Sequence, residues 1–363
     1  MSNGDKMKTA CVTGGSGYIA SALIKMPLEK GYAVKTTVRN TQASLMKLIE
    51  TSDDMAKNSH LKHLQALGPL TVLRADLDEE GSFDEAIAGC DYAFLVAVPV
   101  NLASGEDPEV HRQRVKEVIE PAVRGTLNVM RSCVKAGTVR RVVLTSSVSS
   151  VYFRPELQAG DGHVLDEDSW SDVDYLRAQK PPSWGYRYCA SKVLVEEAAC
   201  RFAAEHGVSL VTVLPVITVG AAPSLNVNTS VPACLSLLSG DEVALGVLKV
   251  IERISGSVPL GHIDDLCRAE LFVAEEPAAP GRYICCGLST TVVELARFLA
   301  HKYPQYDVER NLRTVDGQLL EKPRACLSSA KLVREGFEFK HSTLDEIYDN
   351  VVEYGKALGI LPK

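Results

Sequence analysis

Tyr188 and Lys192 are the first side chains in this sequence whose types and spacing suit catalysis. Residues four apart lie on one face of a helix, so the phenol and the ammonium group can point into one cleft. A nearby cation favours the phenolate and lowers the tyrosine pKa, which suits a proton donor in a reduction. The same spacing is common on ordinary helix surfaces, so this interpretation needs support from elsewhere in the chain.

Two serines follow a predicted strand, Val142–Thr145, and are the second candidates for chemistry: Ser146 and Ser147. In an open parallel sheet, ligands bind beyond the carboxyl ends of the strands. A serine at that edge can hydrogen-bond a substrate oxygen and share its proton with Tyr188. The alternative is simple turn capping, and we expect one of the two serines to do only that.

A glycine-rich run follows a short apolar segment, Thr9–Val12, that is typical of a strand. Gly14 allows a tight turn, and Gly17 lets the backbone approach a pyrophosphate at the start of the next helix. Ala20 takes the place of the third glycine of the commoner motif, where helix–strand packing needs a small residue. An ordinary turn can also produce such a run. The predicted coenzyme contacts in this run are Gly14, Gly15, Ser16, Gly17, Tyr18 and Ile19.

Arg39 follows the next predicted strand, Ala33–Val38, and lies 22 residues after Gly17. An acid near this position usually holds the ribose hydroxyls of NAD, whereas a basic residue accommodates the 2′-phosphate of NADP. A guanidinium group can grip a phosphate through two donors, so Arg39 favours NADP(H), with Lys47 as an additional charge. The alternative is an exposed arginine that only ends the strand.

The composition is that of a folded protein without a nucleic-acid surface. The 363 residues are 46% apolar and carry a net charge of −7, which excludes a mostly disordered chain and argues against nucleic acid or anionic membranes as partners. Ten cysteines include no C-x-x-C pair, so we expect reduced thiols and no metal site, with Cys285 and Cys286 as buried thiols rather than a redox switch. The first residues carry no signal-peptide pattern, and we expect a cytoplasmic protein.

Strand and helix patterns alternate through the first 215 residues, as in a Rossmann-type doubly wound parallel sheet of the α/β class. We expect residues 1–215 to form an NADP-binding domain that carries the catalytic residues. Residues 216–363 are expected to form a smaller, mainly substrate-binding lobe, from which the chain can cross back to the sheet. The uncharged stretch 207–240 is broken by prolines and glycines, so it predicts a buried strand and an apolar loop rather than a membrane span. Further predicted strands are Leu70–Leu73, Tyr92–Val96, Leu210–Val213 and Arg282–Cys286, and the predicted helices are Tyr18–Lys30, Ser82–Ala88, Val118–Ala136, Tyr188–Glu205, Val292–Lys302 and Leu344–Ala357.

These features occur in the order that one reductase site requires, and with them the sequence resembles the extended short-chain dehydrogenases/reductases of plant flavonoid metabolism. The resemblance covers nearly the whole chain and is strongest to the anthocyanidin reductases, with the dihydroflavonol 4-reductases next. Ala20, where dihydroflavonol reductases usually have glycine, favours the first group. The other stretches that carry the resemblance include Lys180–Tyr186, Ser255–Val258, Asp264–Ala269, Gly281–Cys286 and Lys302–Tyr306.

The resemblance implies a catalytic triad of Ser147, Tyr188 and Lys192. It also implies NADP(H) as the coenzyme, a small flavonoid as the substrate, and reduction of anthocyanidins such as cyanidin to epicatechin-type flavan-3-ols with two equivalents of NADPH. Lys192 would also hold the nicotinamide ribose. The implied coenzyme contacts beyond the glycine run are Arg39 at the 2′-phosphate, Asp76 and Leu77 at the adenine, and Val96, Ala97, Pro215 and Val216 along the cleft near the nicotinamide.

Some positions depart from the family pattern and leave the choice of substrate open. Val98 stands where the family usually has a polar residue, and Asn101 where a histidine is common. Tyr152 stands where dihydroflavonol reductases place an asparagine that grips the substrate B-ring hydroxyls. A dihydroflavonol 4-reductase-like or other phenylpropanoid carbonyl reductase is therefore the alternative enzyme. A noncatalytic NADP-binding regulator is the alternative of another class, and the intact triad argues against it.

Overall fold

A computed structural model describes the backbone of residues 7–39, 52–97, 108–158, 160–178, 183–227, 229–313 and 319–362. Side chains are described for these residues except 52–57, 108–118, 158, 177 and 183–187. Lys47, Val98 and Asn101 lie outside the described residues, so their predicted contributions stay predictions.

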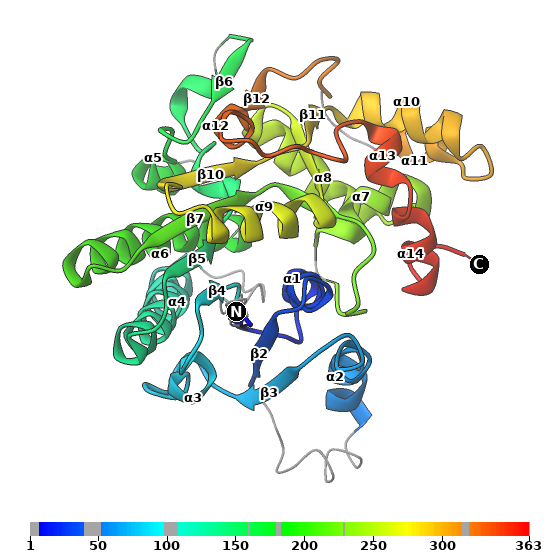
Figure 1. Cartoon of the computed structure of the whole chain (residues 1–363). Helices are drawn as coiled ribbons and strands as arrows, with labels where there is room; N and C mark the ends of the chain where they lie inside the picture. Colours follow the sequence, from blue (N-terminus) through cyan, green and yellow to red (C-terminus); the bar gives the residue numbers. More distant parts are fainter. Residues whose placement is uncertain are drawn as a thin grey trace.

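The centre of the molecule is a seven-stranded sheet in which all neighbouring strands are parallel (Figure 1). Its strand order is β10-β7-β5-β4-β1-β2-β3, so the order reverses between β1 and β4. Such a reversal opens a crevice beyond the carboxyl ends of the strands, where doubly wound folds bind their ligands. The predicted fold class is confirmed. The strands are β1 (Thr9–Val12), β2 (Ala33–Val38), β3 (Leu70–Arg74), β4 (Tyr92–Leu95), β5 (Arg141–Thr145), β7 (Leu210–Pro215) and β10 (Gly281–Cys285).

Helices cover both faces of this sheet. Helices α1 (Tyr18–Glu29) and α9 (Ile263–Glu275) share one apolar cluster with alternate strand residues such as Val12 and Phe94. On the other face, α3 (Asp84–Ile87), α4 (Pro108–Ala136) and α6 (Ser183–His206) share a second cluster with the intervening residues such as Cys11 and Ala93. Burial on both faces explains why the strands consist of nearly continuous apolar runs.

A second group of elements follows β7 in the chain and has its own apolar cluster (Figure 1). It is built around a three-stranded sheet, β11-β9-β8. Residues 281–285, however, return to the large sheet as its edge strand β10, beside β7. The division of the chain after residue 215 therefore stays a prediction about domains. The elements of this group are β8 (Ile217–Val219), α7 (Ser230–Ser239), α8 (Glu242–Ser255), β9 (Val258–His262), β11 (Leu288–Thr290), α10 (Val292–Lys302), α11 (Val308–Arg313), α13 (Leu344–Tyr348) and α14 (Val351–Ala357).

The smaller remaining elements complete the chain. Helix α2 (Ser52–Leu64) packs beside α1, and a two-stranded sheet pairs β6 (His163–Leu165) with β12 (Ala325–Leu327). The others are η1 (Val148–Ser150), η2 (Pro155–Gln158), α5 (Val173–Ala178) and α12 (Ala330–Arg334).

The sequence prediction was wrong in two places beyond strand and helix ends. The stretch expected to be an apolar loop contains the helix α7, whose Pro232 lies in its first turn, where the missing N–H costs no helical hydrogen bond. The single helix predicted over Leu344–Ala357 is two helices, separated by Asp349 and Asn350. The Asn350 side chain is turned to the segment 220–227, where it accepts a hydrogen bond from the Ala221 amide at 3.0 Å.

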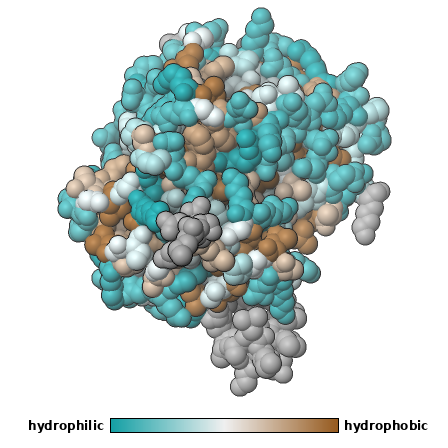
Figure 2. Space-filling model, in the orientation of Figure 1, coloured by the Kyte–Doolittle hydropathy of each residue, from teal (hydrophilic) through white to brown (hydrophobic). Residues whose placement is uncertain are grey.

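The surface in Figure 2 is mostly hydrophilic, with apolar side chains in scattered small areas. None of the helices in the described ranges combines the length and apolar character needed to cross a membrane.

A buried ion pair fastens β10 to α6. Arg282 Nε donates to Glu196 Oε1 at 2.7 Å, and the exposed fractions of the two side chains are 8% and 0%. The guanidinium group also donates to the carbonyls of Glu167 and Ser169, and it stacks on Trp170 at 3.7 Å from the ring centroid. The pair therefore joins the edge strand, the helix of the predicted catalytic residues and the segment 167–170 that precedes this helix.

Replacing Arg282 with methionine is expected to lower the free energy of unfolding by about 3–5 kcal/mol, because Glu196 would be left as an uncompensated buried charge. Urea denaturation followed by circular dichroism measures this loss. The matched control is Arg297→Met, which breaks an ion pair between side chains that are 64% and 71% exposed and should cost less than about 1 kcal/mol. Equal losses in the two variants would contradict the structural role of Arg282.

Candidate active site

The glycine run forms a tight turn between β1 and α1. Gly14 has a φ of +76°, which favours glycine, and a Cβ added there would lie 3.0 Å from the Cβ of Ala97. A Cβ at Gly15 would lie 2.4 Å from the hydroxyl of Thr36, and the Gly17 amide donates to the Gly14 carbonyl at 2.9 Å. The run is therefore built for close approach of backbone, as the sequence predicted.

Two threonine side chains lock this turn to the neighbouring strands. The Thr13 hydroxyl oxygen accepts hydrogen bonds from the amides of Val96 and Ala97, both at 3.0 Å. The Thr37 hydroxyl oxygen accepts from the Gly14 amide at 3.2 Å. Val96 and Ala97, two of the predicted cleft residues, are thus held against the glycine turn at the point where the strand order reverses. Neither threonine was predicted to have this role, although Thr13 directly precedes the glycine run and Thr37 lies in the predicted strand before Arg39.

A cavity of about 360 Å³ opens beside the turn. Ala75, Leu77 and Phe83 give it an apolar wall, which suits an adenine ring, and Arg39 lies at its polar end. The Arg39 side chain is 69% exposed and its Nε lies 3.9 Å from the Asp76 carboxylate, so the guanidinium group is accessible to a phosphate. The residues present therefore fit NADP(H). The remaining lining residues are Gly14, Ser16, Thr37, Val38, Asn58, Ala97 and Asn226.

Asn58 and Asn226 also line the cavity, and neither was predicted as a coenzyme contact from the sequence. Asn58, on α2, accepts a hydrogen bond from the Ser16 hydroxyl at 2.6 Å. Asn226 belongs to the segment 220–227, which the Ser224 hydroxyl joins to the Ser16 carbonyl at 3.1 Å. Only the folded chain brings these amides to the nucleotide pocket, and no spacing in the sequence indicates them.

Tyr18 and Ile19, two of the predicted coenzyme contacts, do not line the cavity, and their side chains contact neighbouring segments instead. The Tyr18 hydroxyl donates to the Gly220 carbonyl at 2.7 Å and so anchors the segment 220–227. Ile19 is partly buried and packs against the apolar cluster between the sheet and α1. Their predicted contacts with coenzyme phosphates would therefore have to come from their backbone amides at the start of α1.

Helix α6 brings Tyr188 and Lys192 to the carboxyl end of β5. Lys192 Nζ lies 5.7 Å from the centroid of the Tyr188 ring and donates to the Thr145 carbonyl at 3.4 Å. Tyr188 is partly buried and Lys192 is 6% exposed. The predicted pair thus shares one helix face and one site.

The side chains of the two predicted serines, Ser146 and Ser147, have different partners. The Ser146 hydroxyl donates to Glu196 Oε2 at 2.8 Å and is therefore turned toward the buried ion pair. Ser147 begins the short helix η1, where its hydroxyl oxygen accepts from the Ser149 amide at 3.2 Å. A side-chain interaction with Ser147 also acts on the pKa of Tyr188. Ser147 is thus the serine beside the tyrosine.

The pKa of Tyr188 moves in the direction opposite to the one predicted from sequence. Burial raises the Tyr188 pKa above its usual value, and the interaction with Ser147 offsets part of that rise. Burial also lowers the pKa of Lys192 to about 8, although Glu196 and Glu270 raise it. The expectation that a nearby cation would dominate was wrong, because desolvation of the phenolate is the largest influence on this pKa.

The other predicted residues lie around this centre. Tyr152 is partly buried, packs on the same small apolar cluster as Tyr188, and has a pKa that burial raises well above its usual value. Pro215 ends β7 and Val216 follows it, both of them buried. Val98, the other predicted substrate contact, lies outside the described residues.

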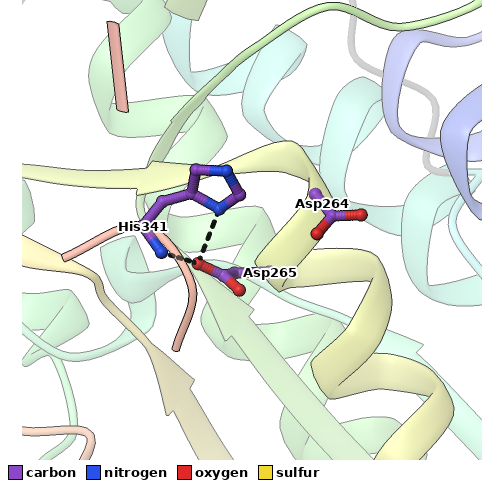
Figure 3. A group of neighbouring side chains, drawn as sticks. All are labelled: Asp264, Asp265 and His341. Carbon is purple, nitrogen blue, oxygen red and sulfur yellow. Dashed lines mark hydrogen bonds and ion pairs between the residues drawn. The ribbon is translucent and has the colours of Figure 1, made fainter. Parts of the chain in front are cut away.

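Asp264, Asp265 and His341 form the one group of three potential metal ligands within the described side chains (Figure 3). Both oxygens of Asp265 are already used by hydrogen bonds. They accept from Arg268 at 2.7 Å, from the backbone amides of Lys340 and His341, and from the His341 ring at 3.1 Å. We therefore interpret the group as a clamp between the start of α9 and the segment before α13.

Comparisons with known proteins agree with this fold over its whole length. The model of the NAD dependent epimerase/dehydratase family matches residues 10–286. An anthocyanidin reductase ((2S)-flavan-3-ol-forming) from Vitis vinifera is 47% identical over 354 residues, which are 98% of this chain and 97% of that protein. A dihydroflavonol 4-reductase from Zea mays is 39% identical over 355 residues, which are 98% and 90% of the two chains.

A solved structure gives the same result. Vestitone reductase from alfalfa (Medicago sativa) matches with a TM-score of 0.74 and 32% identity, over 97% of this chain and 99% of that one. The family model, the two sequence relatives and the solved structure all span the glycine turn, Ser147, Tyr188 and Lys192. On this evidence the chain belongs to the NAD dependent epimerase/dehydratase family, in the branch of the anthocyanidin and dihydroflavonol reductases.

Proposed function

We propose that the chain is an NADPH-dependent anthocyanidin reductase that converts anthocyanidins such as cyanidin to epicatechin-type flavan-3-ols. The observation that carries the proposal is the meeting of Ser147, Tyr188 and Lys192 at the end of β5, in a chain that also forms a cavity lined by the glycine turn and Arg39. The 47% identity to the reductase from Vitis vinifera supports the choice of substrate class.

The glycine turn and the cavity beside it form the coenzyme site. When bound, NADPH supplies the hydride. Arg39 would hold the 2′-phosphate, Leu77 and Phe83 would offer an apolar surface to the adenine, and the amides at the start of α1 would bind the pyrophosphate. The Thr13 hydroxyl holds the backbone of Val96 and Ala97 against the glycine turn.

Tyr188 supplies the proton. Its raised pKa keeps the phenol protonated at neutral pH, which is the form a proton donor needs. Ser147 hydrogen-bonds a ring oxygen of the substrate and stabilises Tyr188 as it gives up the proton. The Lys192 ammonium group then favours the phenolate that remains, and it would also hold the nicotinamide ribose. Tyr152, packed beside Tyr188, offers an aromatic face to a flat flavonoid ring.

A dihydroflavonol 4-reductase is the second candidate, because the Zea mays relative of that name is 39% identical over nearly the whole chain. Purified protein should be incubated with NADPH and either cyanidin or dihydroquercetin, and the products identified by chiral chromatography with mass detection. Flavan-3-ol from cyanidin supports the first proposal. Flavan-3,4-diol from dihydroquercetin, with cyanidin unchanged, supports the second, and no product from either substrate rejects both.

Replacing Tyr188 with phenylalanine is expected to lower turnover by about 10²–10⁴-fold, because the hydroxyl that donates the proton is removed. The affinity for NADPH, measured by fluorescence titration, should stay within about twofold of the unmodified protein. Tyr306→Phe is the control, since Tyr306 packs in the C-terminal group of elements, and it should leave turnover unchanged. Normal turnover in Tyr188→Phe would exclude Tyr188 as the proton donor.

Replacing Arg39 with alanine is expected to raise the dissociation constant for NADPH about 10- to 100-fold, because charge-assisted hydrogen bonds to the 2′-phosphate are lost. The affinity for NADH, which lacks this phosphate, should hardly change. Arg140→Ala is a matched control, because the Arg140 side chain is also 69% exposed and also paired with an aspartate. Arg140 precedes β5, at the amino ends of the strands and away from the predicted coenzyme site. Equal losses of NADPH and NADH affinity in Arg39→Ala would contradict the phosphate contact.

A further inference from the structure

A buried carboxylate lies behind the catalytic lysine. Glu270, on α9, is 0% exposed, and its Oε1 accepts a hydrogen bond from the Thr145 hydroxyl at 2.7 Å. Its Oε2 is also buried, and no donor among the described residues contacts that oxygen. A buried carboxylate oxygen without a donor is costly, so its retention in the core calls for an explanation.

Thr145 connects this carboxylate to Lys192. The residue ends β5, with its hydroxyl on the α9 side of the sheet, where it donates to Glu270. Its carbonyl accepts from Lys192 Nζ, which arrives from α6 on the other side. One residue therefore joins a buried acid and a buried base, and the two opposite charges attract each other through a region from which water is excluded.

The other ionisable groups around the pair do not duplicate Glu270. Glu196, on the same helix as Lys192, raises the pKa of the lysine more than Glu270 does, but its carboxylate is held by Arg282 at 2.7 Å and is unchanged when Glu270 is replaced. Cys267 on α9 and Cys285 on β10 lie near Glu270, and burial raises the pKa of both thiols well above the usual value, so both are neutral at physiological pH. Burial raises the pKa of Glu270 to about 7, so this acid changes charge near neutrality.

We propose that Glu270 is a positioning residue for the reduction, whose carboxylate keeps Lys192 in the ammonium form that Tyr188 and the nicotinamide ribose require. The inference rests on the proposed function of Lys192. Glu270 touches neither coenzyme nor substrate in this scheme and acts only through the charge of the lysine. Removing that charge makes Lys192 lose its proton at a lower pH, whereas a merely structural glutamate would leave the pH profile where it is.

The first test compares Glu270→Gln with the unmodified protein across pH 5.5–9. The alkaline limb of kcat/KM should move down by about one pH unit, in line with the effect of one nearby opposite charge. Activity is expressed as the ratio of variant to unmodified protein at each pH, which cancels pH-dependent changes in the substrate. The ratio should be close to one near pH 6 and fall about tenfold by pH 8.5. An unchanged alkaline limb would overturn the proposal.

Two further variants make this test specific. Glu252→Gln is the matched control, because Glu252 is a buried glutamate (2% exposed) in another part of the chain that accepts from the Val292 and Leu320 amides. It should leave the limb in place. Glu270→Asp retains the charge one methylene farther away, so the alkaline limb should move down by less than in Glu270→Gln. This variant also serves as the test if Glu270→Gln fails to fold.

The second test needs no activity and so separates this inference from the proposed function. The change in melting temperature caused by Glu270→Gln is measured without ligands, in the unmodified protein and in Lys192→Met. At pH 7.5 the two changes should differ, because the charge of Lys192 is the partner that is lost. At pH 5.5, where Glu270 is mostly protonated, they should be equal. Equal changes at both pH values would overturn the proposal even if the protein is a reductase.

Discussion

The parallel pairing of the seven central strands is the constraint on which the site depends. Because every strand points the same way, all the carboxyl ends meet at one edge, and residues far apart in the sequence meet there. The reversal of strand order between β1 and β4 opens this edge, and the Thr13 hydroxyl fixes its two sides to each other. The glycine turn after β1 and the Tyr188–Lys192 pair at the end of β5 therefore lie on the same edge of the sheet.

Buried charge is arranged around this edge in two different ways. Glu196 and Arg282 neutralise each other at close range and act as a fastening between α6 and β10. Glu270 and Lys192 both bond to Thr145 instead of to each other, and burial raises the pKa of the acid to about 7 and lowers that of the lysine to about 8. The first arrangement favours rigidity, and the second leaves a lysine whose charge can respond to what binds beside it.

Local patterns in the sequence predicted the parts of this site that depend on neighbours along the chain. The glycine turn, Arg39 and the helical spacing of Tyr188 and Lys192 were all recognisable, because turn geometry and helix periodicity are local properties. Asn58, Asn226 and Glu270 were not, because only tertiary packing brings them to the site. The direction of the Tyr188 pKa was mispredicted for the same reason, since the burial that sets it cannot be read from spacing.

The edge strand β10 has a consequence for how the protein is made. Strand β7 is complete once residue 215 has been synthesised, but its partner on one side consists of residues 281–285. During translation, one side of the apolar strand β7 therefore remains unpaired until residues 216–280, about 65 residues, have been synthesised and β10 follows. Exposed strands of this kind invite pairing with other chains. In the interval between these two strands the nascent chain is therefore exposed to pairing with other chains.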